Sequence, residues 1–293
     1  MSRKEHNFPK SSIVNGKLCF EEIDDFDKAI NYGVFYVKIP DSVDDKPGWN
    51  YCSNFYLDKS GDKNLDDYRG YSREKFSESA FGYTLKPDQI EQVQLEMSLW
   101  DKYFPSDLCK TLKDMNRIGV FLVEEIFKHI GIPKKLWDTA TGNMASGEAL
   151  QYCIFNHFRS NINSIGGNAH KDSGFITVLC MQESGQEIYL EEEWHPVPPL
   201  KDHFAINIGH SLEILTEKMS KPVNATYHRV VKTVKNKGEP DRHTFGAYIG
   251  PRIDMNLFNF DEKSQSLKVF KKFIDFQKEK AKEMKYPFHP RLN

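Results

Sequence analysis

Residues 170–181, HKDSGFITVLCM, join a His-x-Asp motif to an apolar run that is typical of a strand. Further short apolar runs, separated by Gly, Asn and Pro, lie on both sides of this stretch: LQYCIF at 150–155, HFAINIG at 203–209, HRVVKTV at 228–234 and TFGAYIG at 244–250. Several strands of this kind favour a sandwich or barrel built by antiparallel pairing. We therefore expect a mainly β core.

Helical patterns precede this core. Ile23, Phe26 and Ile30 are spaced like one face of a short helix that Gly33 would end, and a buried strand is expected directly afterwards at 34–40. The stretch 58–81 has no sustained period, which predicts a long surface loop. Apolar residues then recur at helical spacing from Leu108 to Ile126, after Ser106 as a candidate N-cap, and the pattern stops at Gly131. This predicts the longest helix of the chain.

A lysine-rich stretch at 270–285 returns to a helical period and is expected to pack outside the barrel. The whole chain is thus predicted to be mainly β with flanking helices. We expect one domain over 1–293, with three parts: a helix-rich amino-terminal part at 1–147, the core at 148–252 and a carboxy-terminal helical segment at 253–293.

The composition excludes several classes of protein. The 293 residues carry 40 basic and 42 acidic side chains, a near balance that argues against a polyanion-binding surface, so no nucleic-acid partner is expected. No apolar run approaches the roughly 20 residues of a membrane span, and the start, MSRKEHNFPKSS, has no apolar signal segment. The five cysteines never form a CxxC pair, which argues against a disulfide framework or a thiolate zinc site. We expect a cytoplasmic protein without a membrane partner; its oligomeric state stays open.

One histidine of the ten stands in a His-x-Asp arrangement, His170 and Asp172. Residues two apart in a strand point to the same side, so the imidazole and the carboxylate can converge on one point. His228 opens another predicted strand and could supply a third ligand. Two imidazoles and one carboxylate leave positions open on an octahedral ion, which suits non-haem Fe(II) that activates O₂. Taken singly, His170 is as well explained as a loop residue and His228 as a hydrogen-bonded strand residue.

A third motif strengthens the metal hypothesis. Arg242 and Thr244 lie two residues apart at the start of a predicted strand, 14 residues after His228. A guanidinium binds a carboxylate through two parallel hydrogen bonds, and a hydroxyl on the same strand face adds another. The motif therefore predicts a pocket for a small carboxylic acid.

The order HKD, HRV and RHT resembles the His-x-Asp, His and Arg-x-Ser pattern of the isopenicillin N synthase-like group of Fe(II)/2-oxoglutarate dioxygenases. The segments GFITVL, WHPVPP, AINIGHSLEILT and KAINYGVFYVKIP are also similar to that group. The resemblance implies a double-stranded β-helix core of the jelly-roll, cupin-like type. It implies the following roles: iron ligation by His170, Asp172 and His228, binding of the distal carboxylate of 2-oxoglutarate by Arg242 and Thr244, and a candidate cosubstrate contact at Asn156.

Two departures from the family pattern concern the site. Phe158 stands where the family has a tyrosine, so the hydroxyl that often touches the cosubstrate is missing. Residues 235–240 lengthen the connection from His228 to Arg242, which we interpret as a longer hairpin turn. His157 and Phe158 are the further candidates close to the metal, because strand alternation aims one of them inward.

The resemblance implies oxidative decarboxylation of 2-oxoglutarate to succinate and CO₂, coupled to oxidation of a small molecule by hydroxylation, desaturation or cyclisation. The expected cofactors are Fe(II), 2-oxoglutarate and O₂, and a retained Asp172 disfavours halogenation. The substrate is expected to be amino-acid-derived or a secondary metabolite, bound between the loop at 58–81, the turn at 160–168 and the carboxy-terminal helix. Two alternatives stay open: an isopenicillin N synthase-type oxidase that needs no 2-oxoglutarate, and a non-catalytic binding module on the same fold.

Overall fold

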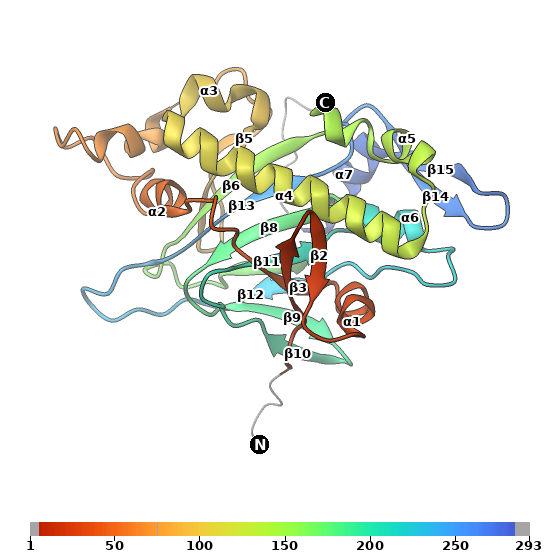
Figure 1. Cartoon of the computed structure of the whole chain (residues 1–293). Helices are drawn as coiled ribbons and strands as arrows, with labels where there is room; N and C mark the ends of the chain where they lie inside the picture. The colour runs from red at the N-terminus through yellow and green to blue at the C-terminus, as the bar shows by residue number, and fades with distance from the viewer. Residues whose placement is uncertain (1–5, 75, 285–293) are drawn as a thin grey trace.

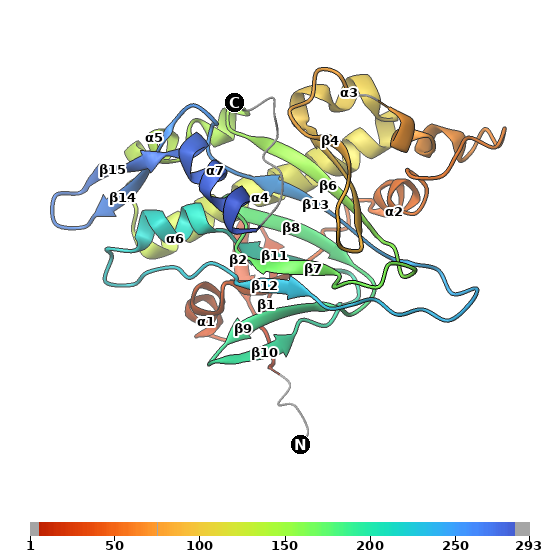
Figure 2. The same cartoon turned by 180° about the vertical axis from the view of Figure 1, so that it is seen from behind.

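The structure is a computed structural model that describes residues 6–74 and 76–284. Its centre is a large sheet that faces a smaller one (Figures 1 and 2). The large sheet has nine strands in the order β2 (Lys17–Phe20), β1 (Lys10–Val14), β3 (Val34–Lys38), β11 (His203–Ile208), β8 (Ile176–Met181), β13 (Arg242–Ile249), β6 (Gln151–Phe158), β5 (Ile90–Glu96) and β4 (Gly82–Leu85). The small sheet has the order β10 (Glu193–Pro196), β9 (Gln186–Leu190), β12 (His228–Val230) and β7 (Gly167–His170).

Strand pairing is antiparallel throughout these two sheets except between β1 and β3. Antiparallel pairs that alternate between two facing sheets are the arrangement that the apolar runs predict. Five runs coincide with strands β6, β8, β11, β12 and β13, and the strand predicted at 34–40 is β3. Since both faces of β8 are covered, all six of its residues are buried.

The helices lie outside the two sheets. They are α1 (Asp25–Tyr32), α2 (Lys46–Cys52), α3 (Trp100–Tyr103), α4 (Ser106–Ile130), α5 (Trp137–Thr141), α6 (His210–Thr216) and α7 (Phe273–Glu283). Short 3₁₀ turns occupy Asp66–Tyr68, Tyr71–Arg73, Met97–Leu99, Lys134–Leu136 and Met144–Ser146. Among the described residues, no helix combines the length and the apolar character that crossing a bilayer requires.

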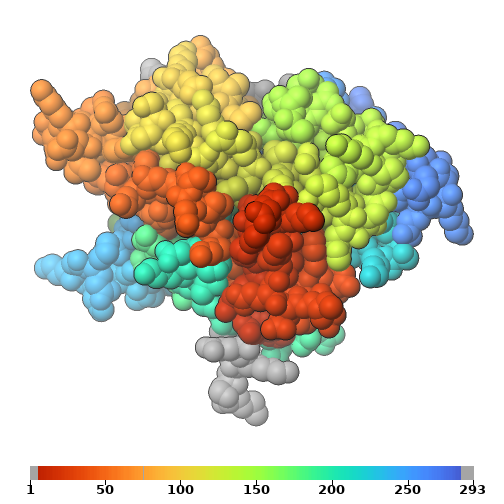
Figure 3. All heavy atoms as spheres, in the orientation of Figure 1, coloured from red at the N-terminus to blue at the C-terminus, as the bar shows by residue number. Residues whose placement is uncertain are grey.

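Helix α4 covers one face of the large sheet, where Figure 1 shows it crossing the strands. It is the longest helix, as its periodicity predicts, and it ends at Gly131, which is left-handed at φ 80°. Gly119 faces the sheet so closely that an added Cβ would lie 2.2 Å from Ile249 Cδ1. The predicted N-cap is wrong by one residue: Pro105 takes that position, and Ser106 begins the helix. Figure 3 shows how α4 and the amino-terminal segments cover this side of the molecule.

The opposite face of the large sheet remains open toward the small sheet and α7 (Figure 2). This division decides where a ligand can bind. Side chains that point toward α4 enter the main apolar core, whereas side chains of the same strands that point the other way line a pocket.

Two predictions about helical segments need correction. Ile23 is 97% exposed because α1 begins only at Asp25, so the apolar face of that helix does not include Ile23. Residues 253–293 are helical only in α7, since a hairpin of β14 (Asn256–Asp261) and β15 (Ser266–Lys272) precedes it; residues 285–293 lie outside the described part.

The connection from β12 to β13 is not a hairpin turn. Strand β12 ends at Val230 and belongs to the small sheet, whereas β13 belongs to the large one. Residues 231–241 therefore cross between the two sheets. The boundary at 147 is likewise not a structural one, because β3 and β5 from the amino-terminal part pair with core strands.

Candidate active site

Strand alternation sorts the side chains of β13 and β6 between the pocket and the outer face. The register pairs Arg242 with Phe158 and Thr244 with Asn156, and all four line the pocket. His243 lies between Arg242 and Thr244 in the sequence and is paired with His157. Both of these histidines point to the other side of the sheet. Both halves of the predicted carboxylate pocket thus come from one pair of strands.

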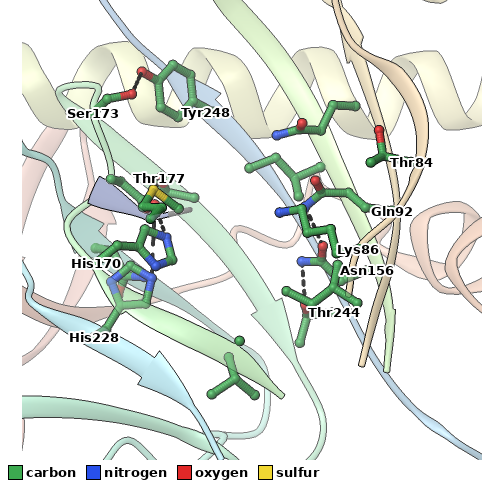
Figure 4. Close-up of a pocket in the computed structure, with 18 of the residues that line it drawn as sticks. Thr84, Lys86, Gln92, Asn156, His170, Ser173, Thr177, His228, Thr244 and Tyr248 are labelled. Carbon is green, nitrogen blue, oxygen red and sulfur yellow. Dashed lines mark hydrogen bonds and ion pairs between the residues drawn. The ribbon is translucent and has the colours of Figure 1, made fainter. Parts of the chain in front are cut away.

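A second group of polar side chains lies on the small sheet. His170 at the end of β7 is paired directly with His228 at the start of β12, and Asp172 follows two residues after His170. Asp172 Oδ1 lies 3.4 Å from His170 Nε2 and 4.0 Å from His228 Nε2. Each residue offers one ligand atom, and the three atoms lie within 4.8 Å of one another. The structure brings the three predicted ligands together, and Figure 4 shows the two histidines side by side.

Neighbouring oxygens orient the three side chains. His170 Nδ1 lies 2.7 Å from the carbonyl oxygen of Asn168, and His228 Nδ1 lies 3.2 Å from that of Thr226. Carbonyl oxygens only accept, so each Nδ1 carries the proton and each Nε2 presents its lone pair to the centre. The other carboxylate oxygen of Asp172, Oδ2, accepts a 2.7 Å hydrogen bond from a threonine hydroxyl on β8.

Protonation states suit metal ligation. Burial lowers the pKa of His228 to about 4, so the ring is neutral at neutral pH. Burial alone would raise the pKa of Asp172, but His228, His170 and the Thr177 hydroxyl outweigh it and hold that pKa well below its usual range. A neutral imidazole and an ionised carboxylate are the forms that bind metal. Two nitrogens and one oxygen fit a first-row divalent ion such as Fe(II), with positions left for other ligands.

The guanidinium of Arg242 is buried and incompletely hydrogen-bonded. Its Nε donates to the carbonyl oxygen of Glu183 at 3.4 Å, and its carbon lies 4.4 Å from the centre of the Phe158 ring. Its Nη1 is buried without a hydrogen-bond partner among the described residues. Burial lowers the pKa of Arg242 to about 10, which leaves it charged at neutral pH. A buried cation with an unused donor is the feature that a bound carboxylate would complete.

Asn156 and Thr244 belong to a chain of hydrogen bonds across three strands. Asn156 Nδ2 donates to Thr244 Oγ1 at 3.1 Å, and Gln92 Nε2 donates to Asn156 Oδ1 at 2.7 Å (Figure 4). The Thr244 hydroxyl thus accepts from Asn156 and keeps its own proton for another acceptor. This geometry gives Asn156 a role in orienting Thr244.

The two groups lie in one cavity of about 480 Å³, a size that suits a small organic ligand. Figure 4 shows His170 and His228 on one side and Asn156 and Thr244 on the other. The cavity wall between them is largely apolar, and it includes Phe81, Leu85, Ile90, Leu150, Tyr152, Ile154, Leu179, Val230 and Tyr248.

The expected pocket segments contribute unequally. Of the loop at 58–81, Phe81 lines the cavity, whereas Tyr68 and Tyr71 pack into or against the main core. The turn at 160–168 contributes Gly167, and the carboxy-terminal helix contributes Gln277, Lys280 and Ala281. Of the two further candidates, Phe158 lines the cavity and His157 lies on the outer face of the sheet.

Sequence reasoning missed Lys86 and Gln92, which enter the cavity from β5 and the turn before it. The stretch QVQLE at 92–96 alternates polar and apolar residues, a strand signal that could have found Gln92. For Lys86 the sequence has no comparable signal.

A model of the 2OG-Fe(II) oxygenase superfamily matches residues 150–260, the stretch that contains the triad of His170, Asp172 and His228 together with Arg242 and Thr244. This part of the chain is therefore similar to that superfamily. The match supports the predicted family, which uses Fe(II), 2-oxoglutarate and O₂. The isopenicillin N synthase-like subgroup stays a prediction.

Two relatives are similar to the chain in sequence, and one solved structure is similar to it in fold. The chain is 30% identical over 172 residues to the 2-oxoglutarate-dependent dioxygenase caaD of Aspergillus niger, which covers 57% of this chain and 48% of the relative. It is 22% identical to 1-aminocyclopropane-1-carboxylate oxidase 3 of Arabidopsis thaliana, with coverage of 66% and 64%. The matches thus span less than two thirds of either relative. The rice dioxygenase for auxin oxidation superposes with a TM-score of 0.66 at 17% identity and covers 98% of both chains, which confirms the predicted double-stranded β-helix fold.

Proposed function

We propose that this protein is a non-haem Fe(II)/2-oxoglutarate-dependent oxygenase that oxidises a small molecule with release of succinate and CO₂. His170, Asp172 and His228 would hold the iron, and Arg242 with Thr244 would bind the distal carboxylate of 2-oxoglutarate. The observation that carries the proposal is the buried Arg242 Nη1, which has no hydrogen-bond partner within residues 6–74 and 76–284 and lies in the same cavity as a preorganised triad.

The metal part of the proposal is supported by the way in which the triad is held. Carbonyl oxygens fix both imidazoles with Nε2 toward Asp172, so the ligand atoms converge before any ion is bound. Holding donors together without a counterion costs stability, and metal binding would recover that cost.

The cosubstrate part is supported by the surroundings of Arg242. The Phe158 ring lies against the guanidinium plane, and Gly185 backs it so closely that an added Cβ would lie 3.1 Å from Arg242 Nε. The guanidinium group is therefore held in one orientation, in which it can bind a carboxylate through two hydrogen bonds. Phe158 itself offers no hydroxyl, so the second contact falls to Thr244.

When bound, Fe(II), 2-oxoglutarate and O₂ supply an oxidant for a C–H bond of the substrate. The chain's own contribution is binding, orientation and exclusion of water. Thr177 holds Asp172 on the face shared with the two histidines, Arg242 and Thr244 hold the far end of the cosubstrate, and apolar side chains line the space between these groups.

The finer parts of the function rest on the family resemblance. We infer a small amino-acid-derived or secondary-metabolite substrate, in agreement with the modest cavity and with relatives such as deacetoxyvindoline 4-hydroxylase of Catharanthus roseus. Hydroxylation, desaturation and cyclisation all suit the same site.

An anaerobic titration tests the proposal. Fe(II) and 2-oxoglutarate together should produce a visible metal-to-ligand charge-transfer band, and turnover should then form succinate in proportion to the O₂ consumed. Intact iron binding without the band would count against 2-oxoglutarate. Oxygen use without succinate would favour the oxidase alternative, in which Arg242 holds a carboxylate of the substrate. Absence of iron binding would favour a non-catalytic module.

A further inference from the structure

A row of polar side chains crosses four neighbouring strands of the large sheet on its cavity side. In the register, Thr244 of β13 is paired with Asn156 of β6, Asn156 with Gln92 of β5, and Gln92 with Thr84 of β4. All four side chains line the cavity, and Figure 4 shows them opposite the two histidines of the triad. Neighbouring strands lie about 4.8 Å apart, so Thr84 lies roughly 14 Å from Thr244 across the sheet. The row therefore extends well beyond the predicted cosubstrate pocket.

The hydrogen bonds of this row leave its outer part unsatisfied. Gln92 Nε2 donates to Asn156 Oδ1 at 2.7 Å, and Asn156 Nδ2 donates to Thr244 Oγ1 at 3.1 Å. Within residues 6–74 and 76–284, neither Gln92 Oε1 nor the Thr84 hydroxyl forms a hydrogen bond. Because Gln92 is only 5% exposed and is held by Asn156, its carbonyl oxygen is a fixed acceptor on the cavity wall.

Gln94 adds an amide that the described protein does not use. It follows Gln92 by two residues on β5, so it points to the same face of the sheet, and it lines the cavity. Its neighbours in the register, Ile154 on β6 and Gly82 on β4, have no hydrogen-bonding group in their side chains. No other described residue forms a hydrogen bond with its amide. Its carbonyl oxygen and its amino group thus both face the cavity without a protein partner.

The other glutamines of the cavity wall have protein partners. Gln186 Nε2 donates to Asn207 Oδ1 at 2.9 Å, and Gln277 Nε2 donates to Ser173 Oγ at 2.7 Å. Lys86 also lines the cavity, but it interacts with other groups of the protein. The unused uncharged groups of the row and of Gln94 therefore lie together on β4 and β5.

These groups match an uncharged ligand that both donates and accepts. Gln94 offers a donor and an acceptor side by side, and Gln92 Oε1 offers a second acceptor. A carboxylate only accepts, so its oxygens would face amide carbonyl oxygens. An ammonium only donates, so it would leave the Gln94 amino group unsatisfied. A cyclic amide, whose N–H and C=O point to the same side, can form two parallel hydrogen bonds with a glutamine side chain.

The position of Gln94 leaves the cosubstrate pocket free. Arg242 and Thr244 lie on β13, and β5 is the second strand from it in the sheet, so Gln94 lies roughly 10 Å from them in the plane of the sheet. Tyr152 and Ile154 line the same wall and suit an apolar remainder of the ligand.

We propose that Gln94, together with Gln92 Oε1 and the Thr84 hydroxyl, binds a cyclic amide group of the primary substrate, which is therefore an uncharged lactam or imide with an apolar body. The inference rests on the proposed function, because it assigns the pocket of Arg242 and Thr244 to 2-oxoglutarate and the groups on β4 and β5 to the substrate.

Calorimetric titration of the anaerobic, Fe(II)- and 2-oxoglutarate-loaded protein tests this assignment. The probes are 2-piperidinone, glutarimide, oxindole and 2-quinolinone, each compared with its N-methyl derivative, which keeps the ring and the carbonyl but lacks the N–H donor. The wild type should bind at least one N–H compound about tenfold more tightly than its derivative. A wild type that prefers no N–H compound would overturn the assignment.

Gln94→Met keeps the length of the side chain and removes its amide. The preference for the N–H compound should fall to within about twofold, because the two parallel hydrogen bonds are lost. The variant should unfold in urea at the wild-type midpoint, since no described residue bonds to this amide, and Gln94→Leu serves if Gln94→Met does not fold. A preference that persists in the variant would overturn the assignment, because the bulk of the methyl group would then explain it.

Gln186→Met is the matched control, since it removes a glutamine of the same cavity whose amide already has a protein partner. It should leave the preference for the N–H compound within about twofold of the wild-type value. An equal loss in this variant would overturn the assignment, because the general polarity of the cavity would then explain the result.

The cosubstrate arm separates this inference from the proposed function. Gln94→Met should retain the charge-transfer band and the wild-type affinity for 2-oxoglutarate. A loss of 2-oxoglutarate affinity as large as the loss of lactam affinity would assign Gln94 to the cosubstrate and overturn the inference. A missing band in the wild type would instead refute the proposed function, and the comparison of each N–H compound with its derivative, measured without added 2-oxoglutarate, would still decide the role of Gln94.

Discussion

Two clusters of ionisable side chains lie on opposite sides of the large sheet. One lies on its outer face, and the other lies in the cavity between the large and the small sheet. On the outer face, His157 Nδ1 lies 2.9 Å from Glu91 and its Nε2 lies 2.8 Å from Asp241. The Tyr56 ring stacks on His157 at 3.8 Å between centroids, and its hydroxyl lies 3.2 Å from His243 Nε2. Both ring nitrogens of His157 therefore have partners.

The cluster inside the cavity differs in how its polar atoms are satisfied. Asp172 Oδ1 and two imidazole nitrogens converge on one another, and Arg242 Nη1 has no partner among the described residues. Buried polar groups are nearly always paired, so a group of incompletely satisfied ones indicates a ligand. Both clusters contain histidines and carboxylates, so residue type does not distinguish the structural cluster from the functional one. The two clusters differ in how completely their polar atoms are hydrogen-bonded. This difference predicts that changes in the outer cluster cost stability and changes in the cavity cost activity.

Asp172→Ala should have the largest effect on activity. The remaining imidazoles would bind iron weakly, so we expect 2-oxoglutarate-dependent turnover to fall by at least about a thousandfold. The free energy of unfolding of the metal-free protein should change by less than about 1 kcal/mol, because the variant removes a buried charge together with its hydrogen bond. Succinate formation, Fe(II) equilibrium dialysis and urea unfolding measure the three quantities. Wild-type-like turnover would mean that the metal lies elsewhere.

His157→Leu tests the other side of the contrast. It leaves the buried carboxylate of Glu91 and the partly exposed carboxylate of Asp241 without their imidazole, so we expect a loss of roughly 2–4 kcal/mol in unfolding free energy at pH 7. His129→Ala is the matched control, since His129 pairs with Asp27 at the surface and should cost less than about 1 kcal/mol. Equal losses in the two variants would contradict a structural role for the outer cluster.

The outer cluster also predicts a pH dependence. Burial alone would raise the pKa of Glu91 and of Asp241, but hydrogen bonds from His157 and other neighbours outweigh it and lower both. A lowered folded-state pKa contributes stability above the unfolded value, near 4, and this contribution is lost as the pH falls through the folded value. The stability difference between the wild type and His157→Leu should therefore shrink below about pH 4 in urea unfolding. A difference that grows there would contradict the assigned pairing.

Arg242→Lys should have a smaller effect that is specific to the cosubstrate. The substitution replaces a planar guanidinium, which can form two parallel hydrogen bonds, by an ammonium group. The KM for 2-oxoglutarate should therefore rise about tenfold, with a smaller change in kcat. Arg229→Lys is the matched control, since Arg229 forms an ion pair with Glu187 on the small sheet. An unchanged response to 2-oxoglutarate in Arg242→Lys would favour the oxidase that needs none.

The sequence alone predicts strands in which consecutive residues are buried. It also predicts the site residues that are neighbours in the sequence. Strand β8 is apolar because both its faces are covered, and His170 and Asp172 form one motif. The hairpin of β14 and β15 was missed, because β15 is largely exposed and only its pairing with β14 makes it a strand.

Gln92 and Lys86 were missed for different physical reasons. Gln92 faces inward but is polar because it lines a cavity, so its strand resembles one with a solvated face. Lys86 enters the cavity only because β5 pairs with β6, a contact between distant parts of the chain. Local patterns do not contain this pairing, and the outer cluster around His157 was missed for the same reason.

Asn156→Ala should have the smallest effect, and it tests whether this residue acts through Thr244. Its amide already has two partners, Gln92 and Thr244, so loss of the amide should free the Thr244 hydroxyl to rotate and raise the KM for 2-oxoglutarate by about threefold. Thr244→Val removes that hydroxyl. If Asn156 acts only by orienting Thr244, the double variant should be no worse than Thr244→Val alone. Multiplicative losses would show instead that Asn156 contacts the cosubstrate itself, and the contrast between satisfied and unsatisfied groups would then fail at this position.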